Sequence, residues 1–563
     1  MALWRIHPQS EGFGGSAQAR RPWALGMLVL LLGGAMSAPA TAQRASCRGG
    51  SPLTTPLTVE WKYTGNYFGN NPAAPVISKD TAYFVTGNHA YAVSVASGAL
   101  KWRYPSDPAT ALPALVVVTP AVVEGVVYLG AGDGLYALNA ADGTLKWHYT
   151  SNGGVATTPV AYNNAIYFIS GIGRIHAVSV ETGDSIGGVW KTGATLGVDA
   201  GGAAIADAAV ANGIIYFTTS NEVMHAIDLS TGVQRWYARP GTVDRISVPV
   251  VSGESVVIAN GNFLSSWRAI TGQKRWTLPL TSNAVVPPAV DPDGNTYVVT
   301  DNREIYAINP RGRGMWAKPA MVDYVPLAAP TYSDGLLFVP TANGGIYAFD
   351  AATGELKWHY LLTPTSTNIN KIPAKVNVGA SAVASNGVLY VLSDDGALTA
   401  FSHDAPDSLP PAITDLDPEQ GEYLSGRAPF HIGAKIADEG SGIDLRTLKL
   451  NLDGRDIPKY APGEEVSGKE GFIFELDTYT LDYTTHDTEG RSSALRDGHH
   501  TATISVKDWK GNQVTKSWLF TIDDTVPRKS RKPKAPGQGG PGGFPGSPGS
   551  GGSNSGGGKG GGA

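Results

Sequence analysis

The stretch Gly345-Ile346-Tyr347-Ala348-Phe349-Asp350-Ala351-Ala352-Thr353-Gly354-Glu355-Leu356-Lys357-Trp358 decides the fold, because close copies of it recur along the chain. Its first half, Ile346–Phe349, is apolar and predicts a short strand, and Leu356–Trp358 opens a second one. Between them, Asp350–Gly354 carries turn residues, and glycine adopts a positive φ there without steric cost. The unit therefore predicts a β-hairpin.

Each copy ends in a tryptophan shortly after its turn glycine, and successive tryptophans from Trp61 to Trp358 are 41, 45, 43, 46, 40, 40 and 42 residues apart. Val59–Tyr63 matches the tail of a copy, and Gly396–Phe401 matches the front of one, so the two make a split eighth unit. The glycine and tryptophan pairs, which we interpret as structural repeat residues, are Gly98 with Trp102, Gly143 with Trp147, Gly183 with Trp190, Gly232 with Trp236, Gly272 with Trp276, Gly312 with Trp316 and Gly354 with Trp358.

A period of about 40 residues is that of a propeller blade made of four short strands. Seven whole units and one split unit predict an all-β, eight-bladed β-propeller over residues 58–404, in which the N-terminal strand around Trp61 closes the last blade. A ring closed in this way exposes no end sheets and needs no disulfide. A small residue in each third strand, such as Ala92 or Ala348, is expected to lie under a tryptophan of the neighbouring blade.

The pattern Gly-x-(Ile/Leu)-Tyr-Ala-Leu-Asp-x-x-Thr-Gly-x-x-x-Trp resembles the repeat of PQQ-like β-propellers, the family of quinoprotein alcohol dehydrogenases and of the BamB type of outer-membrane assembly lipoprotein. The resemblance covers residues 58–404. It implies the fold and leaves catalysis open, because this fold serves both catalysts and scaffolds.

Quinoprotein members of the family hold PQQ beneath a disulfide of adjacent cysteines, with a calcium ion and an aspartate base. This chain has a single cysteine, Cys47, and so lacks the clearest marker of that site. Asp199, Asp394 and Asp395 have no histidine at a meaningful spacing, and we interpret them as turn residues. His148 and His359 each follow an outer-strand tryptophan and form no metal-binding pattern, so packing roles are expected for them.

Residues 1–42 predict an export signal, because Arg20-Arg21 precede the apolar run Trp23–Met36 and Ala40-Thr41-Ala42 is a small-residue cleavage site. The apolar run is shorter than the roughly 20 residues that span a bilayer, so no transmembrane segment is expected after signal removal. Residues 43–57 are a linker. Lipidation of Cys47 remains an alternative, but Arg44 stands where a lipobox has an aliphatic residue, which favours a free or intermolecular thiol.

After a Pro-rich linker at 405–414, the repeat period stops while the strand signal continues through residues 415–525. The predicted strands are Phe430–Ala437, Leu448–Leu452, Phe472–Leu476, His500–Val506 and Thr515–Ile522, which indicate a β-sandwich. The runs Gly440-Ser441-Gly442-Ile443-Asp444 and Asp508-Trp509-Lys510-Gly511-Asn512 resemble bacterial immunoglobulin-like modules, which are spacers or adhesive units. Asp438, Asp444 and Asp508 could meet around a calcium ion, although turn roles account for them as well.

The last segment, residues 526–563, contains almost no apolar residue and predicts a disordered Gly/Pro-rich basic tail. It carries six Lys and Arg residues and no acid, whereas the whole chain has a net charge of −5. The folded body is therefore acidic, which argues against a nucleic-acid partner.

These observations predict an exported, non-catalytic scaffold that binds a protein, or alternatively a polysaccharide, in the periplasm, the outer cell envelope or the extracellular space. Three long connections, Pro105–Thr119, Thr192–Ala208 and Leu361–Val378, emerge on one rim, which is the predicted binding surface; the alternative is that they only cover the channel mouth. Polysaccharide binding needs exposed aromatic residues there, and Tyr67, Phe68 and Tyr360 are the candidates. No catalytic, cofactor-binding or metal-binding residue is expected unless the chain is a quinoprotein-like oxidoreductase, which would use PQQ and calcium.

Overall fold

The computed structural model describes residues 52–526, apart from 66–72, 108–109, 114–115, 117, 188–189, 193–194, 197, 200–201, 205–206, 242–246, 364–375, 426–430, 461–470, 477 and 485–494. Over these residues the secondary structure consists of β-strands without an α-helix. The described part of the chain accordingly contains no helix with the length and apolar character needed to cross a membrane. The predicted signal, Cys47 and nearly all of the tail lie outside the described residues.

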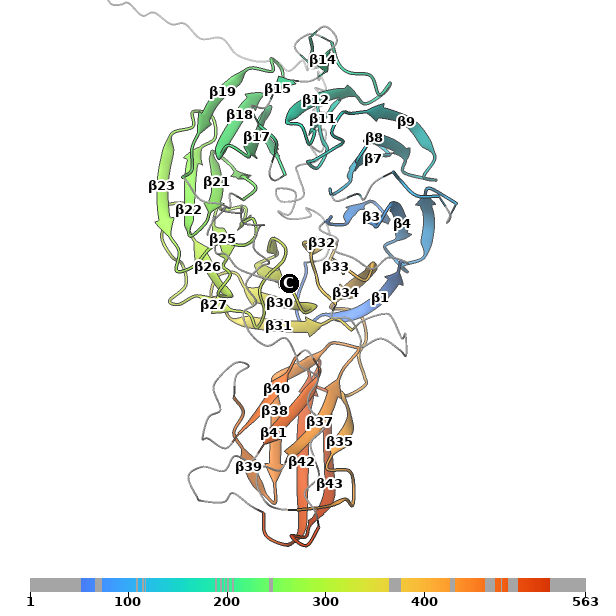
Figure 1. Ribbon diagram of the computed structural model, residues 1–563, viewed down its shortest axis with the longest axis vertical. Helices are drawn as coiled ribbons and strands as arrows, with labels where there is room; N and C mark the ends of the chain where they lie inside the picture. Colours follow the sequence, from blue (N-terminus) through green and yellow to red (C-terminus); the bar gives the residue numbers. More distant parts are fainter. Residues whose placement is uncertain are drawn as a thin grey trace, which may run out of the picture. The chain divides into compact units, whose positions relative to one another are not determined.

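Residues 58–402 form eight four-stranded antiparallel sheets that follow one another around a ring (Figure 1). The first three whole sheets are β2 (Val76–Ser78), β3 (Thr81–Thr86), β4 (His89–Ser94), β5 (Leu100–Tyr104); β6 (Ala121–Val123), β7 (Val126–Ala131), β8 (Gly134–Asn139), β9 (Leu145–Thr150); and β10 (Val160–Tyr162), β11 (Ala165–Ile169), β12 (Arg174–Ser179), β15 (Val198–Asp199). The next four are β16 (Ala209–Ala211), β17 (Ile214–Thr219), β18 (Val223–Asp228), β19 (Gln234–Ala238); β20 (Val250–Ser252), β21 (Ser255–Asn260), β22 (Phe263–Arg268), β23 (Lys274–Pro279); β24 (Ala289–Val290), β25 (Thr296–Val299), β26 (Glu304–Ile308), β27 (Ala320–Met321); and β28 (Thr331–Ser333), β29 (Leu336–Pro340), β30 (Gly345–Asp350), β31 (Leu356–Leu361). A small two-stranded sheet is added by β13 (Lys191–Thr192) and β14 (Thr195–Leu196).

The hairpin predicted from the deciding stretch is confirmed by β30 and β31, which pair with Ala348 opposite Trp358. Strands in the middle of each sheet are buried on both faces, as in β7, where all six residues are buried. A strand between two neighbouring sheets has no solvated face, which is why its sequence is apolar without alternation. The repeat pattern therefore reflects sheets stacked face to face.

The split unit is completed as predicted. Strand β1 (Thr58–Thr64) pairs antiparallel with β34 (Ala397–Ser402), placing Trp61 opposite Ala400, and β33 (Val388–Leu392) and β32 (Val383–Ser385) complete the sheet. The first strand of this sheet, β32, contacts β2 of the following sheet. The two ends of the repeat region are thus held together by backbone hydrogen bonds, which remove the exposed sheet edge.

Neighbouring sheets are joined by the repeat tryptophans. In six repeats the indole Nε1–H donates to a backbone carbonyl in the turn of the next repeat: Trp61 to Val95 (2.7 Å), Trp102 to Ala140 (2.9 Å), Trp147 to Val180 (3.2 Å), Trp236 to Ala269 (2.8 Å), Trp276 to Pro310 (2.9 Å) and Trp316 to Ala351 (3.0 Å).

The tryptophan ring lies against the turn glycine of the next repeat rather than over the third-strand alanine that we expected. A Cβ on Gly354, whose φ is +76°, would come within 2.8 Å of the Trp316 ring. Ala348, the alanine of that repeat, instead pairs in register with Trp358 of its own sheet. The turn glycine is therefore required both for its positive φ and for the close approach of the indole.

Residues 412–526, which we call the C-terminal module, form two sheets around one hydrophobic core that includes Phe472 and Trp518. The four-stranded sheet is β35 (Ala412–Asp417), β37 (His431–Ala437), β41 (Thr480–Thr484) and β40 (Phe472–Glu475). The five-stranded sheet is β36 (Tyr423–Leu424), β43 (Gln513–Ile522), β42 (Gly498–Asp508), β38 (Ile443–Leu452) and β39 (Arg455–Ile457). The strands predicted here from the sequence are confirmed, with β38, β42 and β43 longer than expected.

Candidate functional site

The last repeat tryptophan, Trp358, departs from the pattern of the six tryptophans described above. Its indole Nε1–H donates to the carbonyl of Ser441 in the C-terminal module (3.0 Å), and its side chain is fully buried. The split repeat cannot supply the usual acceptor turn, because the chain leaves β34 at Ser402 and its outer strand comes from the N-terminal segment. A loop of the C-terminal module stands in for the missing turn.

The carbonyl of His403 occupies the sequence position that Ala140 has in the second repeat. It accepts a hydrogen bond from Lys510 Nζ (2.6 Å) in the C-terminal module. Three further bonds tie the repeats to the module: Val59 N–H to Gly440 O (3.2 Å), Tyr360 Oη–H to Glu439 O (3.2 Å) and Tyr479 Oη–H to Leu362 O (3.0 Å). We call this set of contacts the joint; all of its residues belong to one compact unit of the chain.

Two carboxylates shape the loop that bonds Trp358. Asp438 Oδ2 accepts from the backbone N–H groups of Gly440 (3.1 Å) and Gly442 (2.7 Å), and Asp407 Oδ2 accepts from the N–H of Ser441 (2.7 Å). Because the N–H groups point toward these carboxylates, the carbonyls of Gly440 and Ser441 are left to accept from Val59 and Trp358. The acidic side chains therefore act as turn formers, as the sequence suggested for Asp438.

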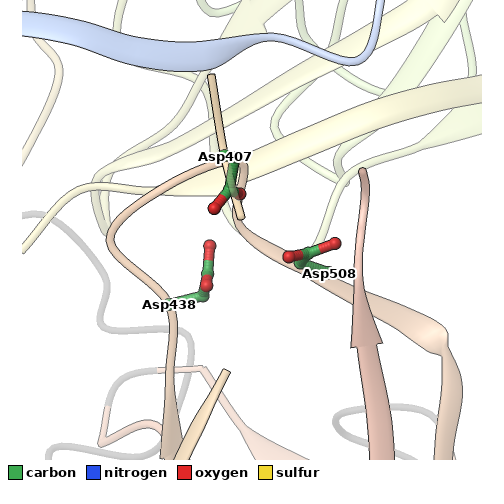
Figure 2. Close-up of side chains that lie close together, drawn as sticks. All are labelled: Asp407, Asp438 and Asp508. Atoms are coloured by element: carbon green, nitrogen blue, oxygen red, sulfur yellow. The ribbon is translucent and has the colours of Figure 1, made fainter. Parts of the chain in front are cut away.

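Asp508 joins Asp407 and Asp438 in an acidic cluster (Figure 2), in which one carboxylate oxygen from each residue lies within 4.8 Å of the other two. Burial, followed by the negative charges of Asp407 and Asp508, raises the pKa of Asp438 to about 6. Three carboxylates at this spacing have the oxygen chemistry that a hard divalent cation prefers. Two of the three aspartates considered for calcium, Asp438 and Asp508, do come together.

Asp444 does not join this cluster, and its place is taken by Asp407 of the linker. The Asp444 carboxylate instead forms a two-pronged ion pair with the Arg446 guanidinium, with N–O distances of 2.8 and 2.9 Å. An arginine two residues along the same strand segment competes for that carboxylate, which is why sequence spacing alone named the wrong third residue.

A cavity of about 340 Å³ lies between the repeats and the C-terminal module, and we call it the joint cavity. The repeats contribute Asp323, Tyr347 and His359 to its walls, and the module contributes Arg446, Lys459 and Trp509. His359 is 7% exposed and also borders a second cavity of about 20 Å³, which has room for one water molecule.

Burial controls the protonation of the groups around the joint cavity. It lowers the pKa of His359 to about 4, against a smaller opposing effect of Asp444, so the imidazole is neutral at pH 7. Burial also lowers the pKa of Lys459, whose Nζ donates to the carbonyl of Leu445 (2.5 Å). Burial and the neighbouring Asp323 raise the pKa of Tyr347 well above its usual value, so its phenol donates to Asp323 Oδ2 (3.0 Å). The polar groups around the joint cavity are therefore suited to hydrogen-bonding a bound molecule.

Two of the three carboxylates that the sequence analysis weighed for catalysis, those of Asp394 and Asp395, form hydrogen bonds within turns. Asp395 Oδ1 accepts from Ser393 Oγ (2.5 Å) and Ala397 N–H (3.3 Å), and Asp394 accepts from the N–H and side-chain amide of Asn377. Asp199 ends β15 opposite Arg174. Asp394 and Asp395 therefore shape turns, the role interpreted for them from the sequence.

Tyr360 was a wrong choice as an exposed aromatic residue of the rim. It is only 4% exposed, because its ring packs edge-on against Phe401 and its hydroxyl bonds the C-terminal module. The other two candidates, Tyr67 and Phe68, lie outside the described residues, as does most of the Leu361–Val378 connection.

Part of the predicted rim is nevertheless described. It is the end of the sheets where second strands turn into third strands, and it exposes Ile172, Phe263 and Met321. The opposite rim, where third strands turn into fourth strands, exposes Val233 and Ile270. Apolar side chains are thus exposed at both ends of the ring.

The joint is the feature that the sequence analysis missed. One signal for it was present: Trp358 is followed by no further copy of the glycine turn, since Ser402-His403-Asp404 stands where the other repeats have one. A repeat tryptophan without a following glycine turn implies that another segment supplies the acceptor for its indole N–H. No local sequence pattern identifies that segment as the Gly440–Gly442 loop.

Comparison with known proteins supports the repeat assignment. A family model described as "Outer membrane protein assembly factor BamB" matches residues 58–199, 189–287 and 265–405. The outer membrane protein assembly factor BamB of Burkholderia pseudomallei is 29% identical over 208 residues, which are 36% of this chain and 52% of that protein. A quinohemoprotein alcohol dehydrogenase, ADH-IIG of Pseudomonas putida, is 26% identical over 245 residues, covering 38% of this chain and 33% of that enzyme.

Among solved structures, BamB from Moraxella catarrhalis superimposes with a TM-score of 0.46 at 15% identity, covering 62% of this chain and 99% of that one. The chain spans about half or less of the length of the curated relatives it matches.

Proposed function

This chain belongs to the family described as outer membrane protein assembly factor BamB, and on that premise we propose that it is an exported, non-catalytic scaffold that binds a protein partner in the cell envelope or outside the cell. We infer that each of its eight four-stranded sheets is one propeller blade and that the C-terminal module is an immunoglobulin-like sandwich. Polysaccharide is the alternative partner.

The observation that carries this proposal is the joint. A module attached through Trp358, Tyr360, Tyr479 and Lys510 is held by side chains and not only by a linker. The ring and the module then present one fixed surface, and a preorganised surface loses less conformational entropy when a partner binds. Rigid presentation is what a recognition platform requires.

Site-specific photo-crosslinking in cells tests the proposal, with a photoreactive residue at Ile172 and the matched position Ile270. These two isoleucines are 51% and 59% exposed and lie on opposite rims. The scaffold function predicts a discrete crosslinked envelope protein from Ile172 and none from Ile270. The same pattern of crosslinks from both positions, or none from either, would contradict a partner-binding rim.

A quinoprotein-like oxidoreductase is the second candidate, favoured by the similarity to the Pseudomonas putida alcohol dehydrogenase. Titration of the purified protein with PQQ and calcium, followed by absorbance, separates the two functions. The scaffold function predicts no stoichiometric cofactor spectrum, and a saturable one would overturn it.

A further inference from the structure

We propose that the joint cavity is a binding site for a neutral saccharide, held between the repeats and the C-terminal module. Its volume of about 340 Å³ falls within the range of small-molecule sites in proteins, which begins near 300 Å³. This site is separate from the partner-binding rim and does not depend on the scaffold function proposed above.

The charged groups around the cavity already have partners of their own. Arg446 is paired with Asp444, Asp323 accepts from Tyr347, and Lys459 donates to the carbonyl of Leu445. The two acids and two bases also balance in formal charge. A ligand with a net charge would have to compete with these pairs and lose its own hydration, which is costly in a partly buried site. A neutral ligand meets no such cost.

Two buried polar groups of the cavity wall lack a partner among the described residues. The His359 imidazole, 7% exposed, makes ring contacts with Tyr347 and Trp509 but no hydrogen bond to any described residue. The Trp509 Nε1–H likewise has no acceptor in the described part of the chain, but this atom has almost no exposed surface, so a molecule in the cavity does not reach it. A polar group left without a partner is destabilising, so a ligand that forms a hydrogen bond with the His359 imidazole gains affinity.

The His359 imidazole selects hydroxyl chemistry. A neutral imidazole offers one donor and one acceptor, and a hydroxyl group both donates and accepts, so it complements either ring nitrogen. Several hydroxyls on one small neutral molecule are the mark of a sugar.

The aromatic side chains that line the cavity complement the apolar faces of a sugar ring. Tyr347, Tyr460 and Trp509 line the cavity, and the Arg446 guanidinium lies 4.4 Å from the centroid of the Trp509 ring. A pyranose presents C–H groups on its faces and hydroxyls around its edge, so its faces suit aromatic rings while its edge reaches polar groups. Because both the repeats and the module supply walls, the bound sugar would also strengthen the joint.

Isothermal titration with N-acetylglucosamine and glucose at millimolar concentrations tests the proposal on the full chain. Binding of either sugar is expected, together with weaker binding of the charged analogues glucosamine and glucuronate. The variant His359→Phe keeps a ring of similar size but loses the hydrogen-bonding nitrogens, and should weaken binding about tenfold, the factor that corresponds to 1.4 kcal/mol. The matched control His148→Phe, which changes the histidine at the same position of the second repeat, should leave binding unchanged.

A second variant, Trp509→Phe, replaces the indole of the cavity wall with a smaller ring and guards against a folding defect in His359→Phe, with thermal unfolding measured for both. The proposal is overturned if neither neutral sugar binds, if a charged analogue binds more tightly, or if both cavity variants bind as the unmodified chain does.

Discussion

The indole Nε1–H of Trp358 donates to the carbonyl of Ser441, 83 residues further along the chain, where each of six other repeat tryptophans bonds the turn of the next repeat. The C-terminal module therefore supplies the hydrogen-bond acceptor for the last repeat tryptophan. The N-terminal strand closes the backbone of the split sheet, and the Gly440–Gly442 loop closes its outer corner. The contacts that complete the ring at this corner therefore also attach the module to it.

The first prediction concerns this bond. Trp358→Phe removes the indole donor from the joint and should lower the free energy of unfolding by about 1–3 kcal/mol, from the lost hydrogen bond and the space left by the smaller ring. The matched control is Trp316→Phe, which breaks the equivalent bond to Ala351 inside the repeats. Hydrogen exchange of residues 438–442 should accelerate in Trp358→Phe alone; equal exchange in both variants would contradict the role of the joint.

The second prediction concerns the turn glycines. Gly354→Ala places a Cβ within 2.8 Å of the Trp316 ring at a φ of +76°, whereas Gly125→Ala has a φ of +80° and no atom within 4 Å. Both variants carry the cost of a left-handed conformation, about 1–2 kcal/mol. Only Gly354→Ala adds overpacking, about 1–3 kcal/mol more. Chemical denaturation should therefore rank Gly354→Ala as clearly less stable than Gly125→Ala, and similar stabilities would show that the indole contact is not tight.

The third prediction is a pH dependence from Asp438. Burial and the nearby Asp407 and Asp508 raise its pKa to about 6, above the value of about 3.9 in an unfolded chain. A raised folded-state pKa contributes stability that is present below the unfolded value and is lost as pH rises through 6. The unmodified protein should lose about 1–2 kcal/mol from this group between pH 4 and 7, after allowance for solvent screening.

Asp438→Asn keeps an oxygen that can accept from Gly440 and Gly442 and removes the titration. Urea denaturation at pH 5 and 7.5 should therefore show a smaller pH difference in Asp438→Asn than in the unmodified chain. The control Asp142→Asn should leave the difference unchanged, since the Thr144 hydroxyl holds the pKa of Asp142 below its usual value and outside this window. An unchanged pH difference in Asp438→Asn would mean that the pKa of Asp438 is not raised in the folded protein.

The fourth prediction concerns His431, which lies between Asp417 (2.9 Å) and Asp482 (3.1 Å) in the C-terminal module. Burial alone would lower its pKa, but the hydrogen bonds to the two carboxylates outweigh burial and raise it to about 9. The stabilisation is therefore complete below the unfolded value of about 6.5 and disappears as pH rises through 9.

His431→Gln should lower the free energy of unfolding by about 1–3 kcal/mol at pH 6 and by much less at pH 10. The control His499→Gln changes a histidine that bonds the Thr521 hydroxyl (3.0 Å) and should have little effect at either pH. Direct NMR titration of the His431 imidazole gives an independent check, and a midpoint near 6.5 would contradict the two-carboxylate clamp.

The repeat unit, the split of its eighth copy and the pairing of Thr58–Thr64 with Ala397–Ser402 could all be derived from the sequence. Each of these features is written in a short contiguous stretch, because strand propensity, turn chemistry and the position of the next tryptophan are local properties. The strands of the C-terminal module could be placed for the same reason. Their alternating apolar residues mark one buried face without any knowledge of the partner sheet.

Only the tertiary structure decided which residues meet at the joint. Asp407 replaced Asp444 in the acidic cluster, Tyr360 became buried, and His359 came to face Trp509, although nothing in their local sequences distinguishes them from similar residues elsewhere. These contacts join segments that are far apart in the chain and depend on how two folded bodies pack. A local pattern records which side of a strand is apolar, but not which distant surface will cover it.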